Sequence, residues 1–416
     1  MRLLFFRPGP AIHCPEPAVP FQSGVPTSAG STIAAHAKAF DIVGNAGNMI
    51  HRMAMVQMLD FDPLRSSHVN LFKLIKKMGG VKSAARLIEE NFDGVVLTMS
   101  NIIRAGASEG EIGALVEELK CDVYCVGAGL QDDIPADLSL LEPDLQHLLR
   151  VLNDKARLLG VRGHQTERWL RAAGISRAQA IGCPSMFVYP RNISTLRPPK
   201  KIDRIISAGH MTPSDMASKT SSRARDLLKA FDGVKASYVF QGEIRNFKAI
   251  AGKLFVYDEA TSRLNATVVS NAIRKASGLE SPFSTYYSFN EVGAWRQACL
   301  RYNAYVGDRI HGGVAAMQAG VPALVLYQDA RVAELVDYHG IPSCHLSDFA
   351  RLGCRAAVEQ HLQQDAFEKF RNKYLAALRV FSDAISASGL RLATQPEIDF
   401  VLSPPVEAAP AIQRAG

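Results

Sequence analysis

Residues 302–338 read YNAYVGDRIHGGVAAMQAGVPALVLYQDARVAELVDY. The apolar run that ends at Tyr305 and Val306 predicts a strand, and Ala323 to Tyr327 predicts a second, fully buried strand. Between them, Val314 to Ala319 is small and apolar, which suits a helix packed on a sheet, and a glycine and a proline end it. The stretch therefore predicts a βαβ unit of a parallel sheet, with Gly307 to Gly313 as the turn at its ligand-binding end.

This turn combines residues that suit an anion. The helix after it presents free N–H groups and a partial positive charge, and Gly312 and Gly313 allow a ligand to approach the backbone. Arg309 adds a planar fork for a phosphate or carboxylate, and His311 can move a proton near neutral pH. We predict an anion site with a titratable group beside it. The alternative is a buried, satisfied histidine and an arginine that caps a neighbouring helix.

Length and composition favour a globular protein of two domains. The chain has 416 residues, of which 47% are hydrophobic and 21% charged. The net charge of +7 favours acidic small molecules, phosphates or an anionic membrane surface as partners. We find no dense basic run, zinc-finger spacing or RNA-binding motif, so we expect no nucleic-acid partner. The apolar run of the N-terminus stops at Phe6, too short for a signal peptide or a membrane span.

The cysteines favour a reducing compartment. Their number is odd, seven, and their spacing is scattered, which predicts reduced thiols in a cytoplasmic protein. Cys121 and Cys125 lie on one predicted strand with no second ligand pair nearby, so we expect no metal site.

Strands alternate with helices along both halves of the chain. In the first half the predicted strands are Leu3–Phe6, Gly94–Met99 and Cys121–Val126, and the predicted helices are Met49–Leu59, Leu71–Asn91 (broken at Gly79-Gly80), Ile112–Lys120, Pro143–Leu159 and Thr166–Ala173. In the second half the further strands are Arg204–Ala208, Ala236–Phe240, Leu254–Tyr257 and Tyr286–Phe289, and the further helices are Ser221–Ala230, Glu291–Arg301 and Ala366–Ser386. The alternation predicts two doubly wound α/β domains.

We therefore expect an α/β fold of two Rossmann-like domains that face each other across a cleft, the GT-B-like architecture. The expected bounds are residues 1–197, residues 198–390 and a C-terminal extension, 391–416, with a disordered tail. The proline- and glycine-rich segment from Pro8 to Pro26 predicts a long loop on the cleft rim.

Several segments resemble the polysaccharide pyruvyl transferase family. GDRIHGGVAAMQAGVPALVLYQDAR is similar to the family's C-terminal signature, with its Arg-x-His turn. Gly160 to Gly163, with Thr166 and Leu170, resembles the family's central segment, and Gly182 to Ser185, with Phe187, resembles the segment directly after that one. The GNAGN turn at 44–48 resembles an Asn-x-Gly-Asp element, although Asn48 stands where an aspartate is common. Read without the family, this turn is either a weak phosphate loop or a tight packing turn.

The resemblance implies transfer of pyruvate from phosphoenolpyruvate to a sugar as a ketal, with no cofactor beyond this donor. It implies that Arg309 and His311 bind phosphoenolpyruvate, with the Ile310 backbone between them and Arg162 helping from the first half. A phosphate and a carboxylate suit two arginines and a helix N-terminus. His311 is our candidate acid for C3 of the enol, and Arg309 is our candidate for stabilising the departing phosphate. An arginine after a strand, such as Arg162, can also be a structural ion pair.

The predicted acceptor is a glycan. Asn45, Asn48, Asn101 and Gln131 follow strands or line turns of the first half, and their amides suit sugar hydroxyls. His164 is a candidate base for an acceptor hydroxyl or else a surface histidine. Further cleft candidates follow strands of the second half: Gln241, Glu243, Asp329 and Arg331.

Two other functions stay open from the sequence. One is a GT-B glycosyltransferase that uses a nucleotide-sugar. The other is a diverged, non-catalytic glycan-binding member of the family, which Asn48 favours. The sequence leaves open the oligomeric state and whether the +7 charge holds the protein at the inner membrane surface.

Overall fold

The computed structural model describes residues 1–6, 45–131, 133–218, 222–258, 260–289 and 291–403. Within these residues the first half forms a six-stranded parallel sheet in the order β2 (Ser67–Val69), β1 (Leu3–Phe6), β3 (Gly94–Thr98), β4 (Asp122–Ala128), β5 (Leu158–Val161) and β6 (Ala178–Ala180). The helices of this half are α2 (Gly47–Met58), α3 (Leu71–Lys77), α4 (Val81–Asn91), α5 (Ile112–Glu118), α6 (Pro143–Lys155) and α7 (His164–Ala172), with the short 3₁₀ helices η2 (Leu138–Leu140) and η3 (Pro184–Phe187).

The second half forms an eight-stranded sheet, again counted over the described ranges. Its order is β14 (Ser343–His345), β13 (Ala323–Tyr327), β12 (Ala304–Gly307), β7 (Ile205–Ser207), β8 (Ala236–Phe240), β11 (Phe283–Ser288), β10 (Arg263–Leu264) and β9 (Tyr257–Asp258). All neighbouring strands are parallel except at the β11–β10–β9 edge. The helices are α8 (Pro190–Ser194), α9 (Pro213–Met216), α10 (Arg223–Ala230), α11 (Lys248–Ala251), α12 (Ala266–Ser277), α13 (Val292–Cys299), α14 (Ile310–Gln318), α15 (Ala330–His339), α16 (Leu346–Leu352), α17 (Cys354–His361), α18 (Gln364–Ala387) and α19 (Gln395–Leu402), with the 3₁₀ helix η4 (Glu243–Asn246).

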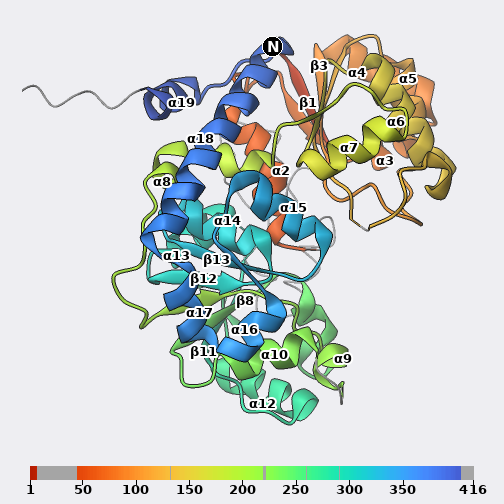
Figure 1. The fold of residues 1–416 in the computed structure, drawn as a ribbon. Coiled ribbons are helices and arrows are strands. Elements are labelled where there is room, and N and C mark those ends of the chain that lie inside the picture. The colour runs from red at the N-terminus through yellow and green to blue at the C-terminus, as the bar shows by residue number, and fades with distance from the viewer. Residues whose placement is uncertain (7–44, 132, 219–221, 259, 290, 404–416) are drawn as a thin grey trace, which may run out of the picture.

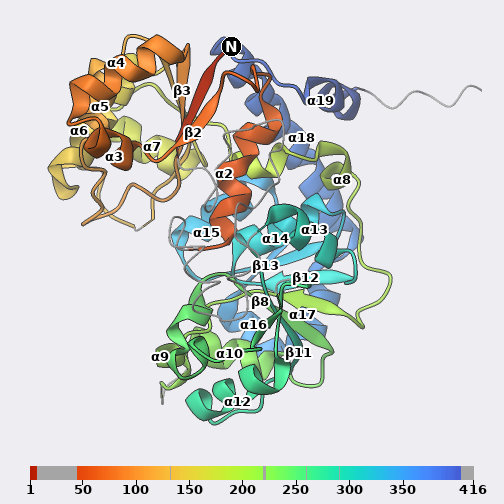
Figure 2. The same ribbon diagram turned by 180° about the vertical axis from the view of Figure 1, so that it is seen from behind.

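The predicted fold class, two Rossmann-like α/β units in a GT-B-like arrangement, is confirmed (Figures 1 and 2). Each sheet is doubly wound and has a point where the strand order reverses. In the first sheet it lies between β1 and β3, and in the second between β7 and β12. Ligands of open α/β sheets bind beyond the carboxyl ends of the strands at such points.

Both faces of the first sheet are buried. Leu3, Phe5 and Val96 pack with α2 in a core that continues into the second half, whereas Leu4 and Val95, next to them in sequence, pack in a separate core. Because successive strand residues point to opposite faces, this alternation explains why the strands read as continuous apolar runs.

Helix α2 and the C-terminus join the two halves. Helix α2 lies between the two sheets in both views and contacts α14, and its four methionines are buried (Figures 1 and 2). Helix α18 runs along both halves, and the chain after it returns to α2, where the Ala393 N–H donates to the Met58 carbonyl at 2.7 Å. Glu334 of α15 accepts hydrogen bonds from the Thr166 N–H at 2.6 Å and hydroxyl at 2.8 Å, so the second half caps α7 of the first.

Two element predictions were wrong. Helix α6 ends at Lys155, and Leu158 and Leu159, which continue its apolar pattern, belong to strand β5. A four-residue apolar run cannot be separated from a helix end by periodicity alone. Of the strand predicted over Leu254–Tyr257 only Tyr257 is in β9, and Leu254 and Phe255 are exposed.

Some predictions fall on residues outside the described ranges: the loop from Pro8 to Pro26, Gly44 of the GNAGN turn, Ser221 and the tail after Ser403. Of the described cysteines, Cys121 is half-buried and the other five are buried, and all six are free thiols. No helix within the described ranges is long and apolar enough to cross a membrane.

Candidate functional site

Loops at both strand-order reversals line one polar cavity. From the first half come the start of α2 and the loops after β3 and β5, and from the second half the loops after β8, β12 and β13. The lining residues are Asn45, Asn48, Ser100, Asn101, Arg162, Gln241, Asp308, Arg309, Ile310, His311 and Arg331. The structure thus brings together seven of the eleven predicted site residues, together with Gln241 and Arg331 from the wider set of candidates.

Arg309 precedes α14 and is held by acidic and polar partners. Its guanidinium forms an ion pair with Glu243, which is buried, and its Nη2 lies 2.9 Å from His210 Nδ1. Burial alone would lower the pKa of Arg309, but the carboxylates of Glu243 and Asp308 outweigh it and raise that pKa above its ordinary value. Arg309 is therefore a fixed, permanently charged group at the cavity wall.

Two lining side chains contain buried polar atoms that lack a hydrogen-bond partner among the described residues. One is Gln241 Nε2, a donor, and the other is Asp308 Oδ1, an acceptor. The second oxygen of Asp308 accepts from Arg223 Nε at 3.0 Å. Because a buried polar atom without a partner is costly, the Gln241 amide is poised for an acceptor oxygen of a ligand.

Arg162, at the end of β5, is a buried charge without a carboxylate partner. Its side chain donates to the Gly127 carbonyl at 2.9 Å and to Asn101 Oδ1. None of the ion pairs among the described residues includes Arg162, although it is only 2% exposed, and the Glu334 carboxylate attracts it only at longer range. Burial lowers the pKa of Arg162, yet a guanidinium keeps its charge. A buried charge without an ion pair is costly, and an anionic ligand in the cavity would offset that cost.

His311, in the first turn of α14, faces the cavity from a positive environment. Burial, followed by the charges of Arg162, Arg331 and Arg52, lowers the pKa of His311 to about 3. The imidazole is therefore neutral near pH 7. Its Nε2 lies 3.8 Å from Cys183 Sγ, and its ring is 5.7 Å from that of His51.

The glycines of the turn serve packing. An added Cβ at Gly312 would lie 2.9 Å from the Tyr305 ring, and one at Gly313 would lie 3.1 Å from Val325. Their N–H groups donate to the Arg309 carbonyl at 2.9 and 3.3 Å. Among the described residues, the N–H groups of Ile310 and His311 have no partner outside the helix, so they are the donors left at this helix end.

Two predicted residues lie away from the cavity. Gln131 accepts from Arg104 at 3.1 Å in an exposed position. The His164 side chain is 63% exposed and pairs with Glu167. Neither is among the lining residues, which favours the surface alternative for His164.

Sequence reasoning missed two buried groups behind His311. His51 of α2 and Cys183, directly before η3, contact each other, with 3.5 Å between His51 Nδ1 and Cys183 Sγ. His51 stands three positions after Asn48, which puts both on one face of α2. Cys183 follows the carboxyl end of β6, so the rule that located the other candidates applied to it as well.

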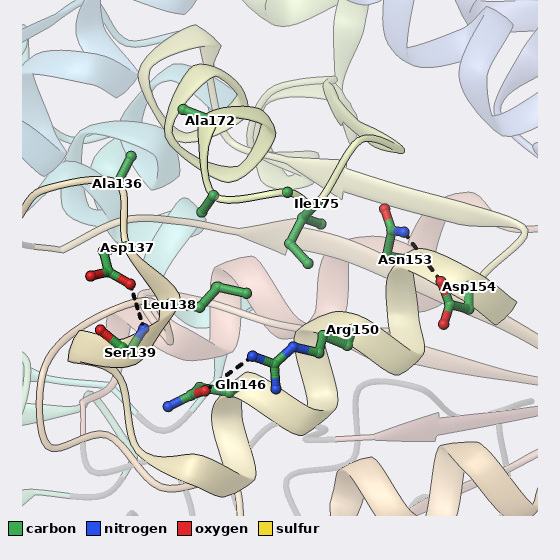
Figure 3. Close-up of a pocket in the computed structure, with 12 residues that line it drawn as sticks. Ala136, Asp137, Leu138, Ser139, Gln146, Arg150, Asn153, Asp154, Ala172 and Ile175 are labelled. Carbon is green, nitrogen blue, oxygen red and sulfur yellow. Dashed lines mark hydrogen bonds between the residues drawn. The ribbon is translucent and has the colours of Figure 1, made fainter.

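A larger cavity of about 680 Å³ is lined by η2, α6 and the end of α7 (Figure 3). Its polar side chains bond to neighbours: Asp137 to the Ser139 N–H, Arg150 to Gln146, and Asn153 to Asp154. It lacks the converging, unpaired charges of the smaller cavity, and we do not assign a function to it.

The chain was compared with solved structures, with curated proteins and with protein-family models. Among solved structures, the chain is similar to Anabaena Alr3699/HepE in complex with UDP and glucose, with 12% identity, a TM-score of 0.46, and coverage of 94% of this chain and 97% of that chain. It is also similar to UDP-GlcNAc 2-epimerase from Methanocaldococcus jannaschii, with 12% identity, a TM-score of 0.43, and coverage of 92% and 100%. No curated protein matches.

The family model described as polysaccharide pyruvyl transferase matches residues 45–329, which is more than half of the chain and includes all but one of the lining residues of the cavity. The protein is therefore a member of the polysaccharide pyruvyl transferase family.

Proposed function

We propose that the protein transfers pyruvate from phosphoenolpyruvate to a sugar of a polysaccharide or of its lipid-linked precursor, forming a pyruvate ketal. The observation that carries the proposal is the buried, unpaired charge of Arg162, which faces Arg309, Arg331 and His311 across one cavity. Membership of the family supports the same reaction.

Phosphoenolpyruvate matches the charges of the cavity. It carries a phosphate and a carboxylate, and the cavity offers three guanidinium groups, two free helix N–H donors and the unpartnered Gln241 amide. The donor would lie between the two halves, with Arg162 on one side and Arg309 on the other. The amides of Asn45, Asn48 and Asn101, all from the first half, would bind hydroxyls of the acceptor sugar.

The protonation of His311 would depend on the donor. In the free protein burial, followed by the charges of the arginines, holds His311 neutral. The negative charges of a bound phosphate and carboxylate would offset those charges and raise the pKa of His311, so that it takes up a proton together with the donor. The proton would then be positioned for C3 of the enol.

The reaction balances without a cofactor. His311 gives a proton to C3, and C2 becomes an oxocarbenium-like centre that a sugar hydroxyl attacks. The C2–O bond to phosphate then breaks, phosphate leaves against Arg309, and a second hydroxyl closes the ketal. Of the two hydroxyl protons released, one restores His311 and the other leaves with phosphate.

We also propose a cytoplasmic location, at the inner face of the membrane where lipid-linked glycans are reached. The net charge of +7 supports this location.

A thermal-shift titration tests the donor site. We expect phosphoenolpyruvate to raise the melting temperature of the wild type, because a ligand of the folded state stabilises it, by about 2.7 kcal/mol at one hundred times its Kd. Arg309→Lys keeps the charge beside Glu243 but loses the fork, so the shift should shrink. Arg104→Lys, a change outside the cavity, is the control. A shift with UDP or GDP alone would identify a nucleotide-sugar glycosyltransferase instead, and no shift with any of the three would favour a non-catalytic binding protein.

A further inference from the structure

A cluster of two histidines and a cysteine lies behind the donor cavity. One possible ligand atom from each of His51, Cys183 and His311 lies within 4.8 Å of the other two, and all three residues are buried. They come from α2, the turn before η3, and α14, so the fold brings together residues far apart in the sequence. We propose that these three side chains bind one thiophilic divalent metal ion, of which Zn²⁺ is the best match. This proposal does not rest on pyruvyl transfer.

The spacing of the three atoms fits tetrahedral coordination. A zinc–sulfur distance of about 2.3 Å and a zinc–nitrogen distance of about 2.0–2.1 Å put sulfur and nitrogen roughly 3.5 Å apart at a tetrahedral angle. Cys183 Sγ lies 3.5 Å from His51 Nδ1 and 3.8 Å from His311 Nε2. An ion would therefore fit between the three atoms with only small movements of the side chains.

The orientation of His51 is also that of a metal ligand. Its Nε2 donates to the Met99 carbonyl, which fixes the proton on that nitrogen and turns the lone pair of Nδ1 toward Cys183. A ligating histidine characteristically donates its other N–H to a carbonyl or carboxylate. The fold provides room for this ring, because an added Cβ at Gly127 would lie 2.5 Å from His51 Cε1.

The ligand set selects the metal. One thiolate and two imidazoles suit Zn²⁺ rather than Mg²⁺ or Ca²⁺, which prefer oxygen. Three protein ligands leave a fourth position open, as in catalytic rather than structural zinc sites. The nearby charges of Arg52, Arg162 and Arg331 oppose a cation, so the thiolate and the two imidazoles must outweigh this repulsion. With Nε2 of His311 on the metal, that atom could not carry the proton of the proposed transfer, so the metal-bound state would be inactive in that reaction.

The alternative is a hydrogen-bonded network without metal. The Cys183 thiol has one proton, and Ser185 Oγ lies 3.0 Å from its sulfur, so the contacts can be satisfied by hydrogen bonds. The two interpretations differ in one observable. A thiolate bound to Co²⁺ absorbs in the near ultraviolet by charge transfer, and a hydrogen-bonded thiol does not.

The test is a titration of the chelator-treated full-length protein with Co²⁺, followed by Zn²⁺. We expect a charge-transfer band that saturates at one equivalent and is bleached by one equivalent of Zn²⁺. Cys183→Ser should abolish the band, and His51→Gln should weaken Co²⁺ binding at least tenfold. Cys125→Ser, which changes a fully buried thiol outside the cluster, should leave it intact. Absence of the band in folded wild type, its persistence in Cys183→Ser, or unchanged Co²⁺ affinity in His51→Gln would overturn the proposal. This optical readout does not depend on phosphoenolpyruvate binding, so the metal proposal and the proposed function can fail independently.

Discussion

Arg162→Gln separates a ligand-binding arginine from a structural one. Glutamine keeps a hydrogen-bond donor but removes the unpaired buried charge. The loss of hydrogen bonds destabilises the folded protein, and the removal of a buried charge stabilises it, so the two effects on the free energy of unfolding should nearly cancel. We expect the free energy of unfolding of the free protein to change by less than about 1 kcal/mol, and the affinity for phosphoenolpyruvate to fall at least tenfold. Urea unfolding and thermal-shift titration measure the two quantities.

The matched control is Arg296→Gln. Arg296 is half-buried and, like Arg162, donates to a side-chain amide, that of Gln318 at 3.1 Å, but it does not line the cavity. The substitution Arg296→Gln should leave the affinity for phosphoenolpyruvate unchanged. If Arg162→Gln instead lost several kcal/mol of stability and kept its affinity, Arg162 would be a structural residue.

His311→Gln should separate binding from chemistry. The proposed mechanism uses His311 as the proton donor, whereas the arginines hold the donor substrate. We expect kcat to fall about 10²–10⁴-fold. Steady-state assays of phosphate release with a glycan acceptor would show this. The affinity for phosphoenolpyruvate, measured by thermal-shift titration, should stay within about threefold of the wild-type value. An equal loss of binding and turnover would mean that His311 acts mainly as a ligand of the donor.

At the scale of elements, Gly47 sets the distance between α2 and the second half. An added Cβ would lie 2.4 Å from Gln241 Oε1 and 3.1 Å from His311 Cβ. Gly→Ala in a helix ordinarily stabilises by roughly 0.5–1 kcal/mol. We expect Gly47→Ala to destabilise the protein instead and to weaken phosphoenolpyruvate binding, because Gln241 and His311 must move.

Gly293, in α13, is the control for Gly47, because an added Cβ there meets no atom within 4 Å. Gly293→Ala should therefore raise the midpoint of urea unfolding and leave binding unchanged. If both variants stabilised the protein equally, α2 would not be held against α14 as closely as the structure shows.

The elements also show what the sequence could and could not reveal. The unit β12–α14–β13 was predicted because strand, turn and helix residues are consecutive and each has a strong local signal. Gln241 and Arg331 were found by one rule, since polar residues after parallel strands meet at one edge, whereas Arg162 was proposed from the family resemblance. Strand β5 was missed because its two leucines continue the apolar pattern of α6. The pairing of β5 with its neighbouring strands decided this assignment, and a local sequence pattern does not reveal such pairing.

The cluster of His51, Cys183 and His311 was beyond local reasoning for another reason. His51 and Cys183 are 132 residues apart, and their contact depends on how α2 inserts between the two halves. Periodicity places a residue on a face of its own helix but does not say which residue of another half it will meet. The role of the turn glycines was likewise set by the Tyr305 ring, which packs against Gly312.

For the whole molecule, the junction between the two halves is built on neutral histidines. The Cys183 N–H donates to His339 Nε2 at 3.0 Å, which requires that this nitrogen carry no proton. Burial lowers the pKa of His339 to about 3, and burial followed by arginine charges lowers the pKa of His311 to about 3. Burial and neighbouring charges lower the pKa of His51 as well. The free energy of unfolding is therefore expected to depend on pH.

Acid should weaken this junction, because the unfolded chain binds protons more readily than the folded protein. Between pH 6.5 and about 3 the unfolded chain binds protons at His311 and His339 and the folded protein does not, so stability is fully present above pH 6.5 and is lost as pH falls. Each histidine should contribute a slope of about 1.4 kcal/mol per pH unit in this window. We expect urea unfolding measured from pH 7 to pH 4 to show His339→Gln with a shallower slope than wild type by about that amount, because glutamine still accepts from Cys183. Equal slopes for His339→Gln and wild type would mean that His339 is protonated in the folded protein, and the junction would then depend on other groups.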